Sequence, residues 1–204
     1  SKFIGDKPDN TWVEDDTDCD DTLAAVNPAA VENNTNSDDL NCDGQIGESP
    51  FIVGDYGPAG GIVFQTDGTK GLEAASSDQD DGTGGEWGCY ATNIAGADSL
   101  TDGAQNTADM LAAACSPYGS GRPLAVDLVS AYSLNGYDDW FLPSRDELIT
   151  LYSKKAIVGG FASYYYWSSY EVDGNTGWAQ NFDDGTQSGG NKNLLLHVRA
   201  VRAF

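Results

Sequence analysis

The sequence predicts an α+β domain in which a hairpin is followed by two helices and then by a set of antiparallel strands. Three observations predict this class. Short apolar runs bounded by Gly-rich turns have the length of strands, and two longer stretches have the spacing and capping residues of helices. The third observation is a change of composition near residue 50, which separates this domain from an acidic segment before it.

The two parts differ sharply in charge. Residues 1–50 hold 13 acidic and two basic side chains, and three of the 25 glycines. The stretch GESPF (47–51) has the composition of a linker, and Gly, aromatic residues and short apolar runs dominate after it. We therefore place a boundary near Pro50, with an acidic arm at 1–50 and a larger domain at 51–204.

The larger domain opens with a predicted hairpin. GGIVFQ (60–65) and GLEAA (71–75) are the strands, and TDGTK is the turn between them. Further strands are expected at 139–143, 164–169, 177–182 and 194–204. The two-residue period of a strand puts Trp178 and Phe182 on one face and Ala179 on the other. The expected core aromatic residues are Trp140, Trp167, Trp178, Phe182 and Phe204.

Residues 101–115 are predicted to form the first helix. The expected buried stripe is Ala104, Ala108, Leu111 and Cys115. Asp102 is the expected N-cap, with Gln105 reaching back to it.

The second predicted helix covers 144–155. Ser144 and Glu147 have the S-x-x-E spacing of a capping box, and the expected buried stripe is Leu148, Leu151 and Tyr152.

Net charge and cysteine spacing limit the classes of function. A net charge of −22 argues against binding nucleic acid, which needs basic patches, and against docking on anionic lipid. The sequence contains no apolar run long enough to insert into a membrane. Four cysteines without a C-x-x-C spacing are consistent with two disulfides and an oxidising compartment, the alternative being free buried thiols. Cys89 and Cys115 are one expected pair.

The acidic arm has the oxygen-rich pattern of a calcium site. Residues 39–46 read D-x-N-x-D-G-x-I, with oxygen side chains at every second position and a glycine that permits the bend. The Glu expected at the twelfth position of an EF-hand is absent, because Pro50 occupies it. The expected ligands of a structural Ca²⁺ are therefore drawn from two clusters: Asp16, Asp18, Asp20, Asp21, Asp39, Asn41, Asp43 and the carbonyl of Gln45. The alternative is an acidic tail with no fixed metal.

The arm also resembles a known repeat. The pattern DDTDCDD … NP … AAVE … DDLNCDG resembles the MopE-type putative metal-binding repeat of secreted bacterial proteins. A disulfide between Cys19 and Cys42 would pull the two acidic clusters together around the ion.

The larger domain carries a second resemblance in the stretches 56–79, 135–148 and 159–204. Its W-S-S, W-x-Q-x-F, G-x-Q, K-N and V-R-A-V-R-A-F elements resemble those of the C-terminal domain of collagen-like bacterial adhesins. They also resemble the variable proteins of diversity-generating retroelements. Both resemblances imply a C-type lectin-like fold with two small antiparallel sheets and two helices, in a secreted or cell-surface protein of a prokaryote or virus.

The second resemblance implies a hypervariable ligand-binding face near 162–204. In such proteins adenines of a template copy are mutagenised, so that residues between the fixed elements vary. The expected binding residues are Tyr164, Tyr166, Tyr170, Val172, Asp173, Thr176, Ala179, Asp183, Asp184, Thr186, Ser188, Leu194, Leu195 and Leu196. Three leucines in a strand cannot all face one side, so at least one is expected to be exposed. An ordinary buried strand remains the alternative for this run.

We predict a non-enzymatic, monomeric ligand-binding protein with an unknown protein or glycan partner. The main alternative is a surface adhesin or lectin with a fixed glycan ligand, although the E-P-N, Q-P-D and W-N-D triplets of calcium-dependent sugar binding are absent. A formylglycine-generating-type oxidase, which shares the fold, would need reactive cysteines after Cys115, and none occurs. A lone histidine, His197, cannot support most catalytic triads. Arg199 and Arg202 are expected to pair with framework carboxylates such as Asp146 or Glu147.

Overall fold

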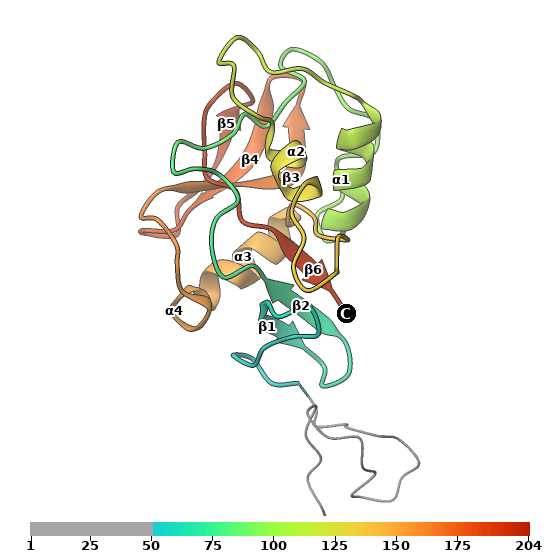
Figure 1. The fold of residues 1–204 in the computed structure, drawn as a ribbon. Coiled ribbons are helices and arrows are strands. Elements are labelled where there is room, and N and C mark those ends of the chain that lie inside the picture. The colour runs from blue at the N-terminus through green and yellow to red at the C-terminus, as the bar shows by residue number, and fades with distance from the viewer. Residues whose placement is uncertain (1–50) are drawn as a thin grey trace, which may run out of the picture. The chain divides into compact units, whose positions relative to one another are not determined.

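The computed structural model describes residues 51–204, in which two small sheets are present (Figure 1). The strand order is β1-β2-β6 in the first sheet and β3-β4-β5 in the second, and all pairings are antiparallel. The last strand of the chain therefore pairs with the hairpin that opens the domain. The strands are β1 (Ile62–Thr66), β2 (Gly71–Ala74), β3 (Tyr165–Asp173), β4 (Thr176–Asn181), β5 (Gln187–Asn191) and β6 (Val201–Ala203).

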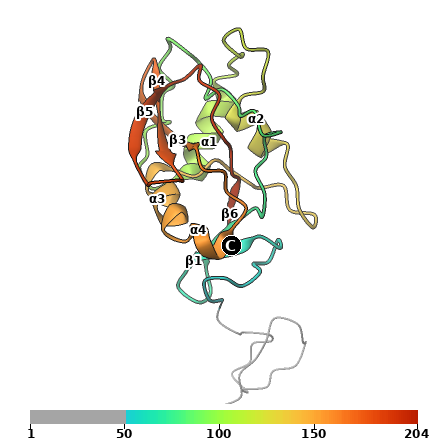
Figure 2. The same cartoon turned by 90° about the vertical axis from the view of Figure 1, so that its left-hand side faces the viewer.

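Four helices accompany the sheets in this part of the chain: α1 (Gly103–Ala112), α2 (Ala125–Ser130), α3 (Arg145–Ser153) and α4 (Lys155–Val158). Helix α1 packs on α2 and β3, whereas α3 contacts strands of both sheets (Figure 2). The predicted α+β class and C-type lectin-like fold are confirmed, and the structure adds the short helices α2 and α4. Within residues 51–204, none of the helices is long and apolar enough to cross a membrane.

Helix α1 begins where the sequence predicts but buries a different face. The Asp102 carboxylate accepts the N–H of Gln105 at 2.9 Å, which confirms the N-cap, although the Gln105 side chain reaches forward to Asp109. The predicted apolar stripe is wrong, because Ala104, Ala108 and Leu111 are exposed and Cys115 is half-buried beyond the helix end. The buried residues are Gly103, Asn106, Thr107 and Met110.

Polar partners explain that choice of face. The Asn106 amide donates to the Ser99 carbonyl at 2.7 Å, and the Thr107 hydroxyl accepts the N–H of Leu142 at 3.0 Å. A buried polar side chain is tolerated when such hydrogen bonds replace those to water. Alanine and leucine can remain at the surface without that requirement.

Helix α3 agrees with its prediction. The Ser144 hydroxyl accepts the N–H of Glu147, and the Glu147 carboxylate accepts the N–H of Ser144 at 2.7 Å, so the capping box is complete. Leu148 and Leu151 are buried and Tyr152 is half-buried, with its ring 5.4 Å from that of Phe182. Burial raises the pKa of the Glu147 carboxyl.

The C-terminal run is the clearest departure from the predicted strands. Residues 194–204 form one short strand, β6, preceded by isolated bridges, whereas β5 arises from the polar sequence QSGGN. The three leucines divide, with Leu194 46% exposed, Leu195 half-buried and Leu196 buried. The expectation of an exposed leucine is thus confirmed.

Two hydrophobic clusters form the core. One gathers Trp87, Trp140 and Trp167, and the other gathers Phe64, Tyr166 and Phe182. Trp178 and Phe204, which the sequence places in the core, are half-buried, and Ala179, expected on the outward face, is buried. The predicted alternation holds, but both faces of β4 are packed: a Cβ at Gly177 would lie 2.6 Å from Trp87, and Gln180 and Phe182 on the even-numbered face are buried as well.

Candidate functional site

The fourteen predicted binding residues fall into three groups by exposure. The exposed ones are Tyr164, Val172, Asp173, Asp183, Asp184, Thr186, Ser188 and Leu194. Tyr170, Thr176 and Leu195 are half-buried, and Tyr166, Ala179 and Leu196 are buried. Most of the predicted face therefore lies at the surface.

The three buried residues are not part of an exposed binding face, and their assignment to it is wrong. Tyr166 packs against Phe182, and its hydroxyl donates to Asp78 at 2.7 Å and accepts the N–H of Ala162 at 2.7 Å. Burial raises the pKa of this hydroxyl. Ala179 and Leu196 pack in the cluster around the tryptophans.

Six predicted residues lie on or beside the second sheet near β5, and we call them the β5 surface: Asp173, Thr176, Asp183, Asp184, Thr186 and Ser188. In the register of β4 and β5, Thr176 pairs with Asn191 and Ala179 with Ser188, so the side chains of Thr176 and Ser188 point to opposite faces of the sheet. Asp183, Asp184 and Thr186 lie in the turn between the two strands, and Asp173 is the last residue of β3, where it pairs with Thr176. Exposed carboxylates therefore flank one end of β5, at Asp183 and Asp184, whereas Asp173 lies across β4 from it.

Local hydrogen bonds keep two of these carboxylates ionised. The Asp173 side chain accepts the N–H of Asn175 at 2.8 Å, and the Asp184 side chain accepts the N–H of Thr186 at 2.8 Å. In each case the backbone donor lowers the pKa of the carboxyl. The β5 surface is negatively charged near neutral pH.

Next to it, α3 places a cation over two aromatic rings. The Arg145 guanidinium lies 5.9 Å from the ring centre of Tyr170 and 5.8 Å from that of Trp178. The indole Nε1 of Trp178 and the amide Oε1 of Gln180 are buried without a hydrogen-bond partner among the described residues. This neighbouring area combines apolar rings with one free donor, the Trp178 indole N–H, and one free acceptor, the Gln180 amide oxygen.

Tyr164 and Leu195 lie at the opposite side of the sheet, beside His197. The ring of Tyr164 stands 6.1 Å from that of His197, and a parallel bridge joins Tyr166 to His197, two residues after Leu195. These two predicted residues are thus separate from the β5 surface.

His197 belongs to a cluster with Asp78 and Asp80 that has the ligand types of a metal site. The carboxylate of Asp80 accepts the N–H groups of Gly82, Gly84 and Val198, at 2.8, 3.2 and 2.9 Å. The carboxylate of Asp78 accepts hydrogen bonds from the Arg199 guanidinium and the Tyr166 hydroxyl. The carboxylate oxygens are occupied by protein donors, so the cluster fixes the 78–84 segment to the end of the chain.

The framework arginines have partners that the sequence analysis did not name. Arg199 donates to Asp78 through Nε at 2.8 Å, and Arg202 donates to Glu73 through Nη1 at 3.0 Å and also to Asp139. The expected partners, Asp146 and Glu147, do not bond these arginines. Those two carboxylates serve α3 instead, at its first turn and capping box.

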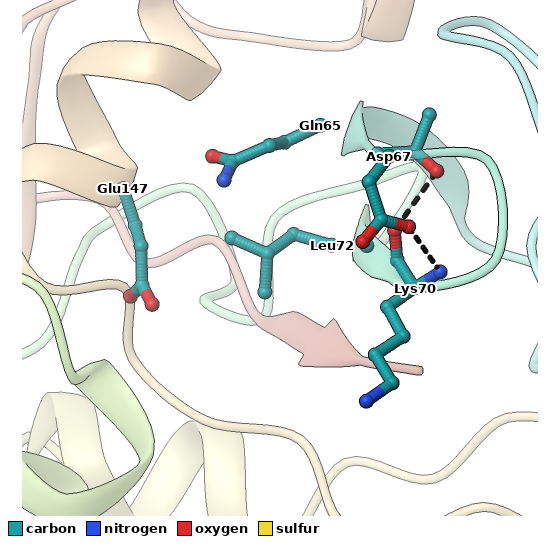
Figure 3. Close-up of a pocket in the computed structure, with 7 residues that line it drawn as sticks. Gln65, Asp67, Lys70, Leu72 and Glu147 are labelled. Atoms are coloured by element: carbon teal, nitrogen blue, oxygen red, sulfur yellow. Dashed lines mark hydrogen bonds between the residues drawn. The ribbon is translucent and has the colours of Figure 1, made fainter.

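A shallow pocket lies away from the predicted face, between the β1–β2 hairpin and the start of α3 (Figure 3). Asp67 accepts the N–H groups of Thr69 and Lys70 at 3.0 and 2.8 Å, which lowers its pKa. Glu147 is engaged in the α3 cap. Because both carboxylates stabilise local structure, this pocket offers few groups to a ligand.

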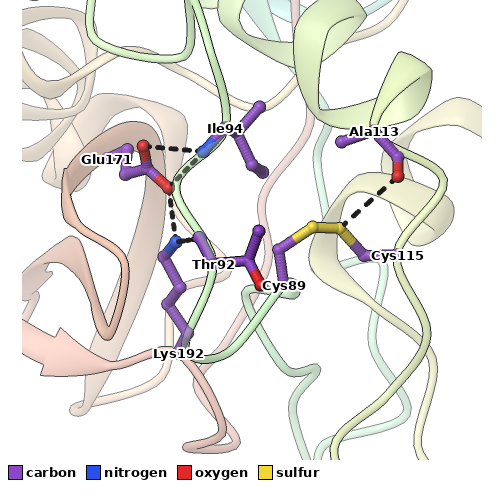
Figure 4. Close-up of a disulfide and its surroundings, with 7 residues drawn as sticks. All are labelled: Cys89, Thr92, Ile94, Ala113, Cys115, Glu171 and Lys192. Atoms are coloured by element: carbon purple, nitrogen blue, oxygen red, sulfur yellow. Dashed lines mark hydrogen bonds and ion pairs between the residues drawn. A yellow bond between two sulfur atoms is a disulfide. The ribbon is translucent and has the colours of Figure 1, made fainter.

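The predicted disulfide between Cys89 and Cys115 is confirmed, with the two Cα atoms 5.1 Å apart (Figure 4). The loop after Cys89 is held by a buried ion pair between Lys192 and Glu171. Lys192 also donates to the Thr92 carbonyl at 2.9 Å, and Glu171 accepts the N–H of Ile94 at 2.9 Å. The K-N element is therefore a structural anchor.

The predicted calcium ligands and the pair Cys19 and Cys42 lie in residues 1–50, outside the described part of the chain. Their assignment stays a prediction, as does the boundary near Pro50.

The fold is that of a lectin-like domain, and the family match indicates a domain of the ligand-binding, adhesin-like class. Residues 79–202, more than half of the chain, match the family model of the Lcl C-terminal domain. The chain belongs to this family, which confirms the predicted relationship to adhesin C-terminal domains. No curated protein matches the chain.

Proposed function

We propose that this protein is a non-enzymatic, secreted or cell-surface receptor whose C-terminal surface is diversified by a retroelement to bind varied macromolecules. The observation that carries the proposal is the contrast in burial along residues 164–204. The fixed elements supply the buried residues Trp167, Gln180, Phe182, Lys192 and Arg199, whereas eleven of the fourteen intervening positions are exposed or half-buried. Substitution at such positions leaves the core unchanged.

The gene itself tests the diversification. We expect an imperfect copy of the segment encoding about 162–204 downstream of the gene, beside a reverse transcriptase, differing almost only at adenines. The differing codons should include those of Asp173, Asp183 and Ser188 and spare those of Ala179 and Leu196, because changes at the buried sites would disturb packing. Absence of the copy would leave an adhesin or lectin with a fixed ligand, to be sought on a glycan array.

We further propose that the acidic arm binds structural Ca²⁺. Carboxylates as dense as those in 15–21 and 38–43 repel one another unless a cation is bound, and oxygen ligands suit Ca²⁺. Chelator should speed proteolysis within 11–48, and added Ca²⁺ should restore resistance, with Mg²⁺ as the control. Equal cleavage rates in chelator and in Ca²⁺ would contradict the site.

A further inference from the structure

The first sheet has both of its outer strands covered by a further stretch of backbone. Beside β1, the N–H of Val63 donates to the Asp55 carbonyl at 2.9 Å, and the N–H of Gly54 donates to the Val63 carbonyl at 2.8 Å. Beside β6, Val201 and Phe141 exchange two backbone hydrogen bonds of 2.8 and 3.0 Å. Neither edge of this sheet is open to another strand.

The second sheet has one covered edge and one open edge. Beside β3, the N–H of Trp167 donates to the His197 carbonyl and the N–H of His197 donates to the Tyr165 carbonyl, both at 3.0 Å. On the other side, β5 pairs with β4 alone among the described residues, at the outer edge of the sheet (Figure 2). Four of its five residues are exposed. β5 is thus the one outer strand of the described domain without a covering strand, although its outward Asn191 carbonyl accepts the Leu194 N–H at 2.9 Å and its Gly189 carbonyl accepts the Ser188 hydroxyl at 3.1 Å.

The register shows which backbone groups of β5 point outward. The pairs 175/192 and 181/186 are hydrogen-bonded, since Lys192 N–H donates to Asn175 at 2.9 Å and Asn181 N–H donates to Thr186 at 2.8 Å. Bonded and non-bonded pairs alternate in an antiparallel ladder, so 177/190 and 179/188 are bonded as well. The N–H groups of residues 187, 189 and 191 therefore face away from β4, where no described residue accepts them.

This edge also lacks the features that prevent edge pairing. The strand QSGGN contains no charged residue and no proline, and its pairing with β4 is regular, whereas β1–β2 and β3–β4 have register shifts. Its two glycines leave the outward backbone accessible. Exposed carboxylates lie at one end, where Asp183 and Asp184 occupy the turn between β4 and β5.

We propose that the open edge of β5 binds an extended, basic peptide segment of a partner protein, which adds a fourth strand to the sheet. This inference rests on the proposed ligand-binding function and names the class of partner. A five-residue strand is about 17 Å long, so a basic side chain at the end of the peptide beside the β4–β5 turn would reach Asp183 and Asp184. A second copy of the chain fits less well, because each carries a net charge of −22.

The first experiment selects binders from a phage-displayed library of random decapeptides against the full 204-residue chain. We expect enriched sequences with Lys or Arg at one end of about five strand-forming residues, and binding that weakens with added salt. The Gln187→Pro variant removes an outward N–H at the first position of β5, where proline is tolerated in an edge strand. It should weaken the selected peptides about tenfold or more, whereas the matched Gln187→Ala variant should not.

A second measurement leaves the protein unchanged, so that a folding defect cannot mimic the result. N-methylation of alternate peptide residues should abolish binding at one parity and leave the other parity within about twofold, because alternate N–H groups of an added strand face the edge. Equal sensitivity at both parities, full binding to Gln187→Pro, or a library that yields no basic peptide would each overturn the proposal.

The outcomes also separate this inference from the proposed function. If a glycan or folded protein binds the chain and Gln187→Pro leaves its affinity unchanged, the ligand-binding function stands and the strand-addition proposal fails. A dimer at micromolar concentration in sedimentation, lost in Gln187→Pro, would identify the occupant as a second copy and likewise contradict a basic peptide.

Discussion

The two sheets of this domain differ in how their residues are used. In β1-β2-β6 both edges are covered, and the Glu73 carboxylate is fully buried, where it accepts N–H groups from Ala59 and Gly61 and pairs with Arg202. In β3-β4-β5 the strand β5 is exposed, glycine-rich and uncovered. The first sheet therefore fixes the fold, while the second offers a surface that can change without cost to the core.

The largest effect should come from breaking the buried pair in the first sheet. Glu73→Ala leaves Arg202 without one of its two carboxylate partners and removes the acceptor of two backbone N–H groups, so we expect a loss of about 3–5 kcal/mol in the free energy of unfolding. Urea unfolding measures it. Asp173→Ala in the second sheet is the matched control, with an expected change within about 0.5 kcal/mol. Equal losses in the two variants would remove the distinction between the sheets.

The disulfide ranks next. It closes a loop with a sequence separation of 26, so the double substitution Cys89→Ser with Cys115→Ser should cost about 2–4 kcal/mol through the greater freedom of the unfolded chain. Thermal unfolding of the wild type with and without reductant should show a loss of stability of the same size as the double substitution. A reduced wild type as stable as the oxidised one would be inconsistent with this role.

Two neighbouring tyrosines of the predicted face test the boundary between scaffold and surface. Tyr166→Phe removes a buried hydroxyl with two hydrogen bonds and leaves the Ala162 N–H without its acceptor, so we expect a loss of about 1–3 kcal/mol. Tyr164→Phe removes an exposed hydroxyl and should leave stability unchanged. Chemical denaturation measures the free energy of unfolding of both variants. Similar losses in the two would contradict the difference in burial between the two positions.

The smallest effect concerns the carboxylates of the β5 surface in acid. The Thr186 N–H lowers the pKa of the Asp184 carboxyl in the folded chain below its ordinary value of 3.8. The stability that this carboxylate contributes is therefore complete above about pH 4, and it is lost as the pH falls through the lowered pKa of the folded state. Melting temperatures of Asp184→Asn should therefore fall less steeply than those of the wild type below about pH 4. Parallel curves for the two proteins would show that the Thr186 hydrogen bond contributes nothing.

The sequence by itself determined the features that depend on neighbouring residues. The cap at Asp102, the capping box of Ser144 and Glu147, and the opening hairpin follow from contacts within a few positions, and spacing is enough to find them. The resemblance of the W-S-S and V-R-A-V-R-A-F elements supplied the fold class and the outline of the variable face. The disulfide was predictable because Cys89 and Cys115 are the two cysteines of the larger domain.

Tertiary structure alone decided the rest. Asp78 and Glu73, which pair with Arg199 and Arg202, lie 121 and 129 residues away in sequence, and the buried face of α1 depends on polar contacts to Ser99 and Leu142. The sequence analysis did not predict β5, because the residues of QSGGN rarely favour strands. This segment forms a strand through its pairing with β4. The burial of Tyr166, Ala179 and Leu196 and the open edge of β5 likewise depend on which segments meet in space, and a local sequence pattern does not specify that.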